Sequence, residues 1–138
     1  MNNEQSSQNQ QYQTNTKLLS IVLLNVVTTW LHYTDNALSL DKYTGFPWFT
    51  PANVISTVAI MTPVGIAGYW LHKGGHRKIA YFLLGVYSIT SLSSLGHYLL
   101  PGALAMPTRM HISIWMDGIA GLLLISFLSR LIVRDKGR

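Results

Sequence analysis

Residues 18–36 read LLSIVLLNVVTTWLHYTDN, an apolar run from Leu18 to Leu31 that ends directly in the polar cluster His32-Tyr33-Thr34-Asp35-Asn36. Apolar side chains are favourable in lipid, whereas ionisable groups are costly there. If this run crosses a bilayer, the polar cluster lies at the water-facing edge of the membrane. We expect a second cluster to meet it there, formed by Gly96-His97-Tyr98 with Arg109, His111 and Asp117.

The composition indicates a single membrane domain. Of the 138 residues, 49% are hydrophobic and only 11% are charged, and this balance is typical of membrane proteins. The chain has no cysteine, which excludes disulfides, thiolate nucleophiles, thiolate-bound zinc and iron–sulfur centres. The formal charge of +5 lies in short basic clusters beside apolar runs, so the expected partner is the lipid bilayer and nucleic acid is excluded.

The apolar runs predict an all-α polytopic membrane protein with four transmembrane helices in an antiparallel bundle. The second run, from Pro51 to Leu71, is long enough at about 1.5 Å per residue to cross a hydrocarbon core of about 30 Å, and the first run can continue as helix through the polar cluster towards Leu40. Residues 1–16 are rich in Gln, Asn and Ser, which predicts a disordered tail. The expected segments are this tail, a transmembrane domain (17–134) with spans at about 17–40, 51–71, 79–100 and 110–133, and a basic C-terminal tail (135–138).

Proline, glycine and aromatic residues mark the boundaries of these spans. Residues 41–50 carry four aromatic side chains and are predicted to lie as a loop in the membrane interface. Pro51 suits the first turn of the second span, and Pro63 is expected to kink it. Pro101-Gly102 ends the third span. A secretory signal peptide is the rival interpretation of the first run, but its long uncharged leader and the lack of a small-residue cleavage site argue against it.

The basic residues predict the orientation. With four spans, eight of the ten Lys and Arg residues lie on one side, and only Lys42 and Arg109 lie on the other. Because Lys and Arg accumulate in cytoplasmic loops, both termini are expected in the cytoplasm. The protein is thus predicted to be a multi-pass integral membrane protein, with a bacterial inner membrane as its location, and the His32 cluster faces the extracytoplasmic side.

The four-span topology brings polar residues from different spans to common depths. His32, His97 and His111 all fall near the outer ends of their spans, and Asn25 and Asp117 each lie about 9 to 10 Å deeper. An unpaired carboxylate within a span costs at least about 2.5 to 3.5 kcal/mol, so Asp117 is expected to pair with His97, His32 or Asn25. The sequence therefore predicts a ligand pocket near the extracytoplasmic leaflet, lined by His32, Asp35, Asn36, His97, His111, Asp117 and Asn25.

Several other interpretations of these residues stay open. Histidines at a membrane boundary are often interfacial anchors, and Asp117 could only hold helices together. His32, His97 and His111 could ligate zinc, copper or iron, or two of them a haem. His97 or His32 with Asp117 or Asp35 could act as acid and base on a lipid-soluble substrate. The hydroxyls from Ser88 to Ser94 and the pairs Gly65/Gly68 and Gly118/Gly121 are expected to serve helix packing.

One resemblance adds to this interpretation. His32-Tyr33-x-Asp35-Asn36, then Tyr43 and Pro47-x-Phe49, and finally Gly96-His97-Tyr98 resemble small bacterial four-span membrane proteins that have no assigned activity. The resemblance covers Leu18 to about Val133 and offers no catalytic residues to carry over. Sterol isomerases and sigma-2-like proteins share only the general plan of a polar pocket in a small bundle.

The function expected from the sequence is therefore binding rather than catalysis. The pocket is predicted to hold a small amphipathic ligand or to mediate assembly with a membrane-protein partner. A metal- or haem-binding protein, and an isomerase-like or hydrolase-like enzyme, are the alternatives. No catalytic residue is assigned and no cofactor is required by the sequence.

Overall fold

The computed structural model describes residues 2–42 and 49–137, and these residues contain helices, turns and short connections but no strand. The all-α class expected from the sequence is confirmed. Short 3-10 segments extend two of the helices or lie between them. The elements are α1 (Asn2–Ser39), η1 (Leu40–Lys42), α2 (Pro51–Lys73), α3 (Arg77–Leu92), η2 (Ser93–Leu99), η3 (Ala103–Ala105) and α4 (Thr108–Lys136).

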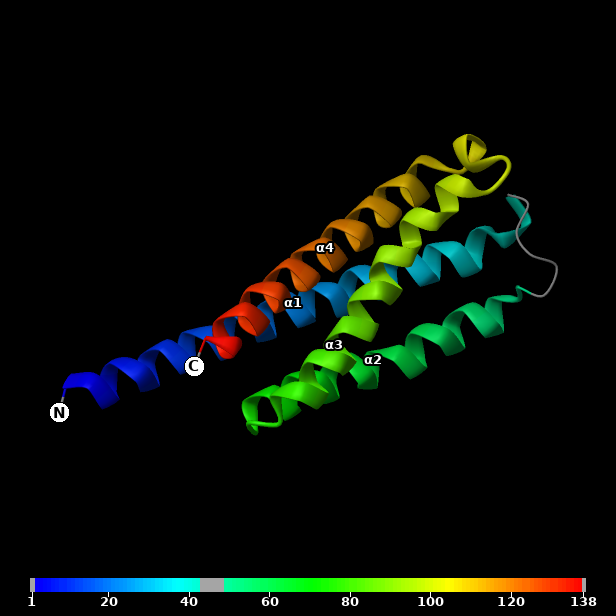
Figure 1. Ribbon diagram of the computed structural model, residues 1–138. Helices are drawn as coiled ribbons and strands as arrows, with labels where there is room; N and C mark the ends of the chain where they lie inside the picture. Colours follow the sequence, from blue (N-terminus) through cyan, green and yellow to red (C-terminus); the bar gives the residue numbers. More distant parts are fainter. Residues whose placement is uncertain (1, 43–48, 138) are drawn as a thin grey trace.

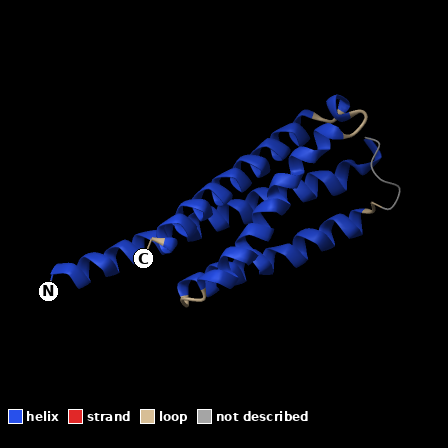
Figure 2. Ribbon diagram, in the orientation of Figure 1, coloured by secondary structure: helices blue, strands red, loops and turns tan. Residues whose placement is uncertain are grey.

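The four α-helices form an elongated bundle in which each helix packs against two neighbours (Figures 1 and 2). Going round the bundle, the order is α1, α2, α3 and α4, and α4 returns to α1. Both chain ends and the α2–α3 turn lie at one end of the bundle, which we call the terminal end. The 3-10 segments η1, η2 and η3 lie at the other end, the loop end.

Three helical stretches are long and apolar enough to cross a membrane. They are Pro51–Lys73, Arg77–Leu99 and Thr108–Lys136, which correspond to the second, third and fourth predicted spans. The stretch Arg77–Leu99 combines α3 with η2. The first predicted span lies within α1, where the polar cluster from His32 to Asn36 follows the apolar run.

Local sequence explains where these helices begin and end. The Thr50 hydroxyl accepts a hydrogen bond from the Asn53 backbone N–H (3.2 Å) and caps α2, with Pro51 in the first turn. The helix then continues through Pro63. After η2, the Ala103 N–H donates to the Leu100 carbonyl (3.2 Å) across Pro101 and Gly102. Gly102 has a φ of 79°, so this is a turn that requires a glycine at its third position.

The structure differs from the prediction at residues 2–16, which are helical rather than disordered and extend α1 beyond the bundle. The Gln11 amide nitrogen donates to Asn15 Oδ1 (3.0 Å), and the Thr14 hydroxyl donates to the Gln10 carbonyl (2.8 Å). Thr14 is only 8% exposed because this part of α1 lies against the end of α4. Of the predicted interfacial loop, residues 43–48, with Tyr43 and Pro47, lie outside the described residues.

Glycines allow α3 to approach two different neighbours along its length. A Cβ on Gly65 of α2 would lie 2.6 Å from Tyr87 Cδ1, and one on Gly68 would lie 2.7 Å from Leu84 Cγ. Towards the loop end, a Cβ on Gly121 of α4 would lie 3.0 Å from the Ser91 Cβ, so here α3 is close to α4. Residues of this size permit close helix contact in membranes. The packing role expected for Gly65/Gly68 and Gly118/Gly121 is thus confirmed.

This arrangement makes α3 cross from α2 towards α4 on its way to the loop end. Figure 1 shows α2 and α3 together near their turn and well separated at the opposite ends of the two helices. The amino-terminal half of α2 contains no glycine that would allow α3 to approach it closely. A cavity occupies this part of the bundle, between α1, α2 and η2.

Candidate functional site

The cavity at the loop end has a volume of about 510 Å³ and is lined by both polar and apolar side chains. We call it the imidazole cavity, because two histidines from different helices face it. Its lining comes from α1, α2 and η2 and from the residues that flank α2 and η2. The lining residues are His32, Tyr33, Asn36, Phe49, Asn53, Val54, Thr57, Ser93, Ser94, Gly96, His97, Leu99 and Leu100.

The 3-10 geometry of η2 decides which of its residues line the cavity. With three residues per turn, residues i and i+3 lie in one row. Two neighbouring rows line the cavity, one of Ser93, Gly96 and Leu99 and one of Ser94, His97 and Leu100. The third row, Leu95 and Tyr98, packs against the apolar cluster of Ala103, Met106, Met110 and Ile114.

The sequence around η2 favours this tighter helix. The Ser93 hydroxyl donates to the Thr90 carbonyl (2.6 Å), and the Ser94 hydroxyl donates to the Ser91 carbonyl (2.7 Å). Such side-chain bonds to the preceding turn compete with regular α-helical bonding. Gly96 has a low α-helix propensity, and Pro101 keeps Leu100 in an extended conformation (φ −87°, ψ 145°). The helical stretch therefore tightens before it ends.

Two predicted histidines meet in the cavity wall. The rings of His32 and His97 make an edge-to-face contact with 5.2 Å between their centroids. The Asn36 amide nitrogen lies 3.3 Å from His97 Nε2, so the amide donates and this ring nitrogen accepts. His32 is 2% exposed and Asn36 is 6% exposed. The structure thus brings His32 and His97 together, as expected from their common depth, and Asn36 of the same helix as His32 joins them.

Two polar atoms in this wall have no hydrogen-bond partner among the described residues. They are His32 Nδ1 and Asn36 Oδ1, and both are buried. A buried polar atom without a partner costs roughly 1 to 3 kcal/mol. A molecule in the imidazole cavity that presents its own polar group could supply the missing hydrogen bonds.

Asp117 and Asn25 lie in a separate layer that does not line the cavity. The Asp117 Oδ1 accepts hydrogen bonds from Thr29 (2.7 Å) and Thr28 (3.4 Å). Thr29 also lies 3.0 Å from the Ser91 hydroxyl. Asn25 donates from Nδ2 to the backbone carbonyls of Ala120 and Ile21, at 2.9 Å each. The expected pairing of Asp117 with His97, His32 or Asn25 is therefore replaced by bonds to threonine hydroxyls.

Asp35 and His111 also lie outside the cavity lining. The Asp35 carboxylate is 3.6 Å from Arg109 Nε, and Arg109 also donates to the Ser39 hydroxyl (3.1 Å). The His111 ring stacks on Tyr98, with His111 Nδ1 3.0 Å from the Tyr98 hydroxyl. These contacts join α1 to α4 and η2 to α4. The residues predicted to line one pocket therefore lie in three places: the imidazole cavity, the layer around Asp117, and the contacts of Asp35 with Arg109 and of His111 with Tyr98.

The three-histidine metal site is not formed. Within residues 2–42 and 49–137, no three His, Asp or Glu side chains gather closely enough to hold a metal ion. The reason is the position of His111, which follows η3 and pairs with Tyr98 instead of facing His32 and His97.

No family model, curated protein or solved structure matches this chain. The resemblance to small bacterial four-span proteins therefore stays a prediction.

Several cavity residues were not predicted from the sequence as part of the pocket. Asn53 and Thr57 of α2 lie in the cavity wall and are not among the predicted pocket residues. Tyr33, Ser93 and Ser94 were missed. The row of Ser94, His97 and Leu100 at three-residue intervals is the signal that could have found the serines, but only if η2 had been recognised as a 3-10 helix.

Proposed function

We propose that this protein is a four-span integral membrane protein whose imidazole cavity binds a small, uncharged amphipathic molecule. The observation that carries the proposal is the combination of volume and lining. A volume of about 510 Å³ falls within the range of about 300 to 1,000 Å³ that is usual for small-molecule sites. Such sites are mostly apolar with a few placed polar groups, and this lining has both.

The charge of the cavity favours an uncharged ligand. Among the described residues that line it, none is Asp, Glu, Lys or Arg. Its polar groups are imidazoles, amides and hydroxyls, which can donate or accept hydrogen bonds to a neutral group. His32 Nδ1 and Asn36 Oδ1 are the atoms that such a group would contact, because they have no other partner in the described chain. The apolar part of the ligand would lie against Val54, Leu99 and Leu100.

The burial pattern of α1 supports a fourth span. In a water-soluble helix the buried face is apolar, but between Leu23 and Leu38 this pattern is reversed. The buried side chains are polar, namely Asn25, Thr28, Thr29, His32 and Asn36. The exposed ones are apolar except for Thr34, namely Leu23, Leu24, Val27, Trp30, Leu31 and Leu38. Lipid is the solvent that suits this outer face.

The orientation proposed from the charges is compatible with the positions of the chain ends. Both termini and the basic α2–α3 turn lie at the terminal end of the bundle. With the positive-inside rule, that end faces the cytoplasm and the imidazole cavity lies near the extracytoplasmic leaflet. Reporter fusions at the α2–α3 turn and at the C-terminus should both report a cytoplasmic location. Reporters on opposite sides of the membrane would contradict the four-span topology.

Filling the cavity tests the binding function. Gly96 lines the cavity, and a Cβ added there meets no atom within 4 Å, so Gly96→Leu should fill it without disturbing the packing. Gly85 of α3 is a matched control, because its Cβ also meets no atom within 4 Å and it does not line the cavity. Molecules retained by protein purified from its native membrane would be extracted into organic solvent and quantified by mass spectrometry.

We expect the native chain and Gly85→Leu to retain one small amphipathic compound in near-stoichiometric amount, and Gly96→Leu to lose it. His32→Leu should weaken retention while leaving the fold intact, since it removes an unpartnered polar atom. Equal retention by the Gly96 and Gly85 variants would contradict binding in this cavity.

A further inference from the structure

A second cavity lies at the terminal end, between the amino-terminal part of α1 and the last turns of α4. It has a volume of about 260 Å³. Phe127 and Leu131 of α4 provide its apolar side, and Gln10, Gln13 and Thr14 of α1 provide amide and hydroxyl groups. The cavity exists because α1 continues as a helix past its apolar run and lies beside α4. We call it the cationic cavity, for the three residues described next.

Lys17, Arg130 and Arg134 line this cavity, and no Asp or Glu is among its described lining residues. Three positive charges at one small site repel one another unless an anion lies between them. Arg134 Nε is buried and has no hydrogen-bond partner among the described residues. The site therefore has both uncompensated charge and an unused donor.

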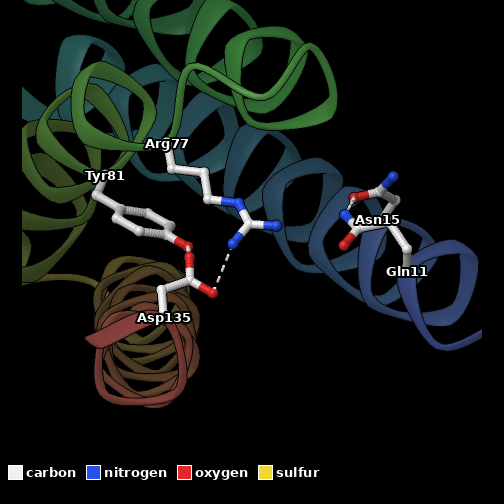
Figure 3. Close-up of polar contacts among 5 residues, drawn as sticks. All are labelled: Gln11, Asn15, Arg77, Tyr81 and Asp135. Atoms are coloured by element: carbon white, nitrogen blue, oxygen red, sulfur yellow. Dashed lines mark hydrogen bonds and ion pairs between the residues drawn. The ribbon is translucent and has the colours of Figure 1, made fainter. Parts of the chain in front are cut away.

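The acidic residue that follows Arg134 in the sequence is already engaged elsewhere. Asp135 forms an ion pair with Arg77 (2.8 Å) and accepts a hydrogen bond from the Tyr81 hydroxyl (2.5 Å). Figure 3 shows the Arg77 guanidinium reaching from α3 to Asp135 on α4, with Gln11 and Asn15 of α1 on its other side. Because Arg77 and Tyr81 occupy both oxygens of this carboxylate, the charges of the cationic cavity are left for an external anion.

We propose that the cationic cavity binds the phosphate of an anionic phospholipid. Basic pockets between membrane helices at the cytoplasmic face suit anionic head groups. Lys17 and Arg130 are exposed, and Lys17 directly precedes the apolar run of α1, which places it at the level of a lipid head group. Phe127 and Leu131 would contact the glycerol and upper acyl chains. The site lies at the opposite end of the bundle from the imidazole cavity, so it does not depend on the ligand proposed there.

The test measures lipid binding to the full chain in detergent by native mass spectrometry. Phosphatidylglycerol is titrated against phosphatidylcholine with identical acyl chains, and inorganic phosphate is added in a separate arm. The cavity variants are Lys17→Gln, Arg130→Gln and Arg134→Gln. Lys78→Gln and Lys136→Gln are matched controls, because they remove the same charge from exposed positions near the same end that do not line the cavity.

We expect the native chain to prefer phosphatidylglycerol, and each cavity variant to bind it about fivefold more weakly, from the usual contribution of one basic residue near an anionic lipid. The control variants should bind as the native chain does. Should Arg134→Gln fail to fold because its Nε is buried, the two exposed variants still decide the result.

Three outcomes would overturn the proposal. Equal binding of phosphatidylcholine would show that no anion is recognised. An equal loss in the Lys78 and Lys136 variants would show that only overall charge matters. Displacement of the lipid by inorganic phosphate, with the same dependence on Lys17 and Arg130, would assign the site to a free anion.

Discussion

The close contact between α2 and α3 predicts a large difference between two alanine substitutions of the same kind. In Gly65→Ala the new Cβ would lie 2.6 Å from Tyr87 Cδ1 and 2.7 Å from Cε1. Tyr87 is fully buried, so its ring has no free space into which to move. In Gly85→Ala the new Cβ meets no atom within 4 Å. Both changes occur within a helix, so both gain the same helix propensity of up to about 1 kcal/mol.

The difference between the two variants therefore isolates the steric cost. Extra atoms in a well-packed interior cost about 1 to 3 kcal/mol, so Gly65→Ala should be less stable than Gly85→Ala by about that amount. Gly68→Ala should behave like Gly65→Ala, because its Cβ would lie 2.7 Å from Leu84 Cγ and 3.3 Å from the Leu84 backbone nitrogen.

The measurement is reversible unfolding in mixed micelles with increasing dodecyl sulfate, followed by circular dichroism. Gly85→Ala should unfold at the native detergent fraction or above it, and Gly65→Ala clearly below it. If the two variants unfold together, α2 and α3 do not approach at Gly65, and the crossing of α3 that leaves room for the imidazole cavity is wrong.

Two further predictions concern polar contacts between helices. Asp117→Leu should lower the free energy of unfolding by about 1 to 3 kcal/mol, because Thr29 loses its hydrogen-bond acceptor inside the bundle. Asp117→Asn keeps an acceptor oxygen and should lower it less. In the same unfolding assay, equal losses for the two variants would contradict a hydrogen-bonding role. In a double-mutant cycle of Arg77→Gln and Asp135→Asn, the coupling free energy should be below about 1 kcal/mol and should fall with added salt, since the Arg77 side chain is 36% exposed. A coupling free energy that does not depend on salt would contradict this exposure.

The positions of the spans could be predicted because they depend on the length of apolar runs. The predicted spans at 51–71, 79–100 and 110–133 each fall on a helical stretch that is long and apolar enough to cross a membrane. The third ends at Leu99, just before the Pro101-Gly102 turn expected to end it. The depth argument placed His32 and His97 at one level, and the rings of these two histidines are in contact.

The partners of individual side chains could not be predicted, because depth fixes a level in the bundle but not a direction around each helix. Asp117 shares a level with Asn25, yet its hydrogen bonds go to Thr28 and Thr29. His111 shares a level with His97, yet it turns to Tyr98. The angle of each residue depends on helix packing and on local pitch, and the change to three residues per turn in η2 gives no clear periodic signal in so short a segment.

Residues 2–16 are helical although their polar composition predicted disorder, and the reason is a different one. These residues have too little apolar surface to form a core of their own. However, they continue a helix that already exists in α1, so they do not bear the cost of nucleating one. Contact with the end of α4 then buries Thr14.

The pitch of η2 also sets the direction in which His97 points. A 3-10 helix turns by about 120° per residue and an α-helix by about 100°, and they rise by about 2.0 and 1.5 Å. Over the five residues from Leu92 to His97, rewinding to an α-helix would rotate the imidazole by about 100° and draw it back by about 2.5 Å. That movement would separate His97 from Asn36 without any displacement of α1 or α2, so a change confined to a few backbone hydrogen bonds would alter the wall of the proposed binding site.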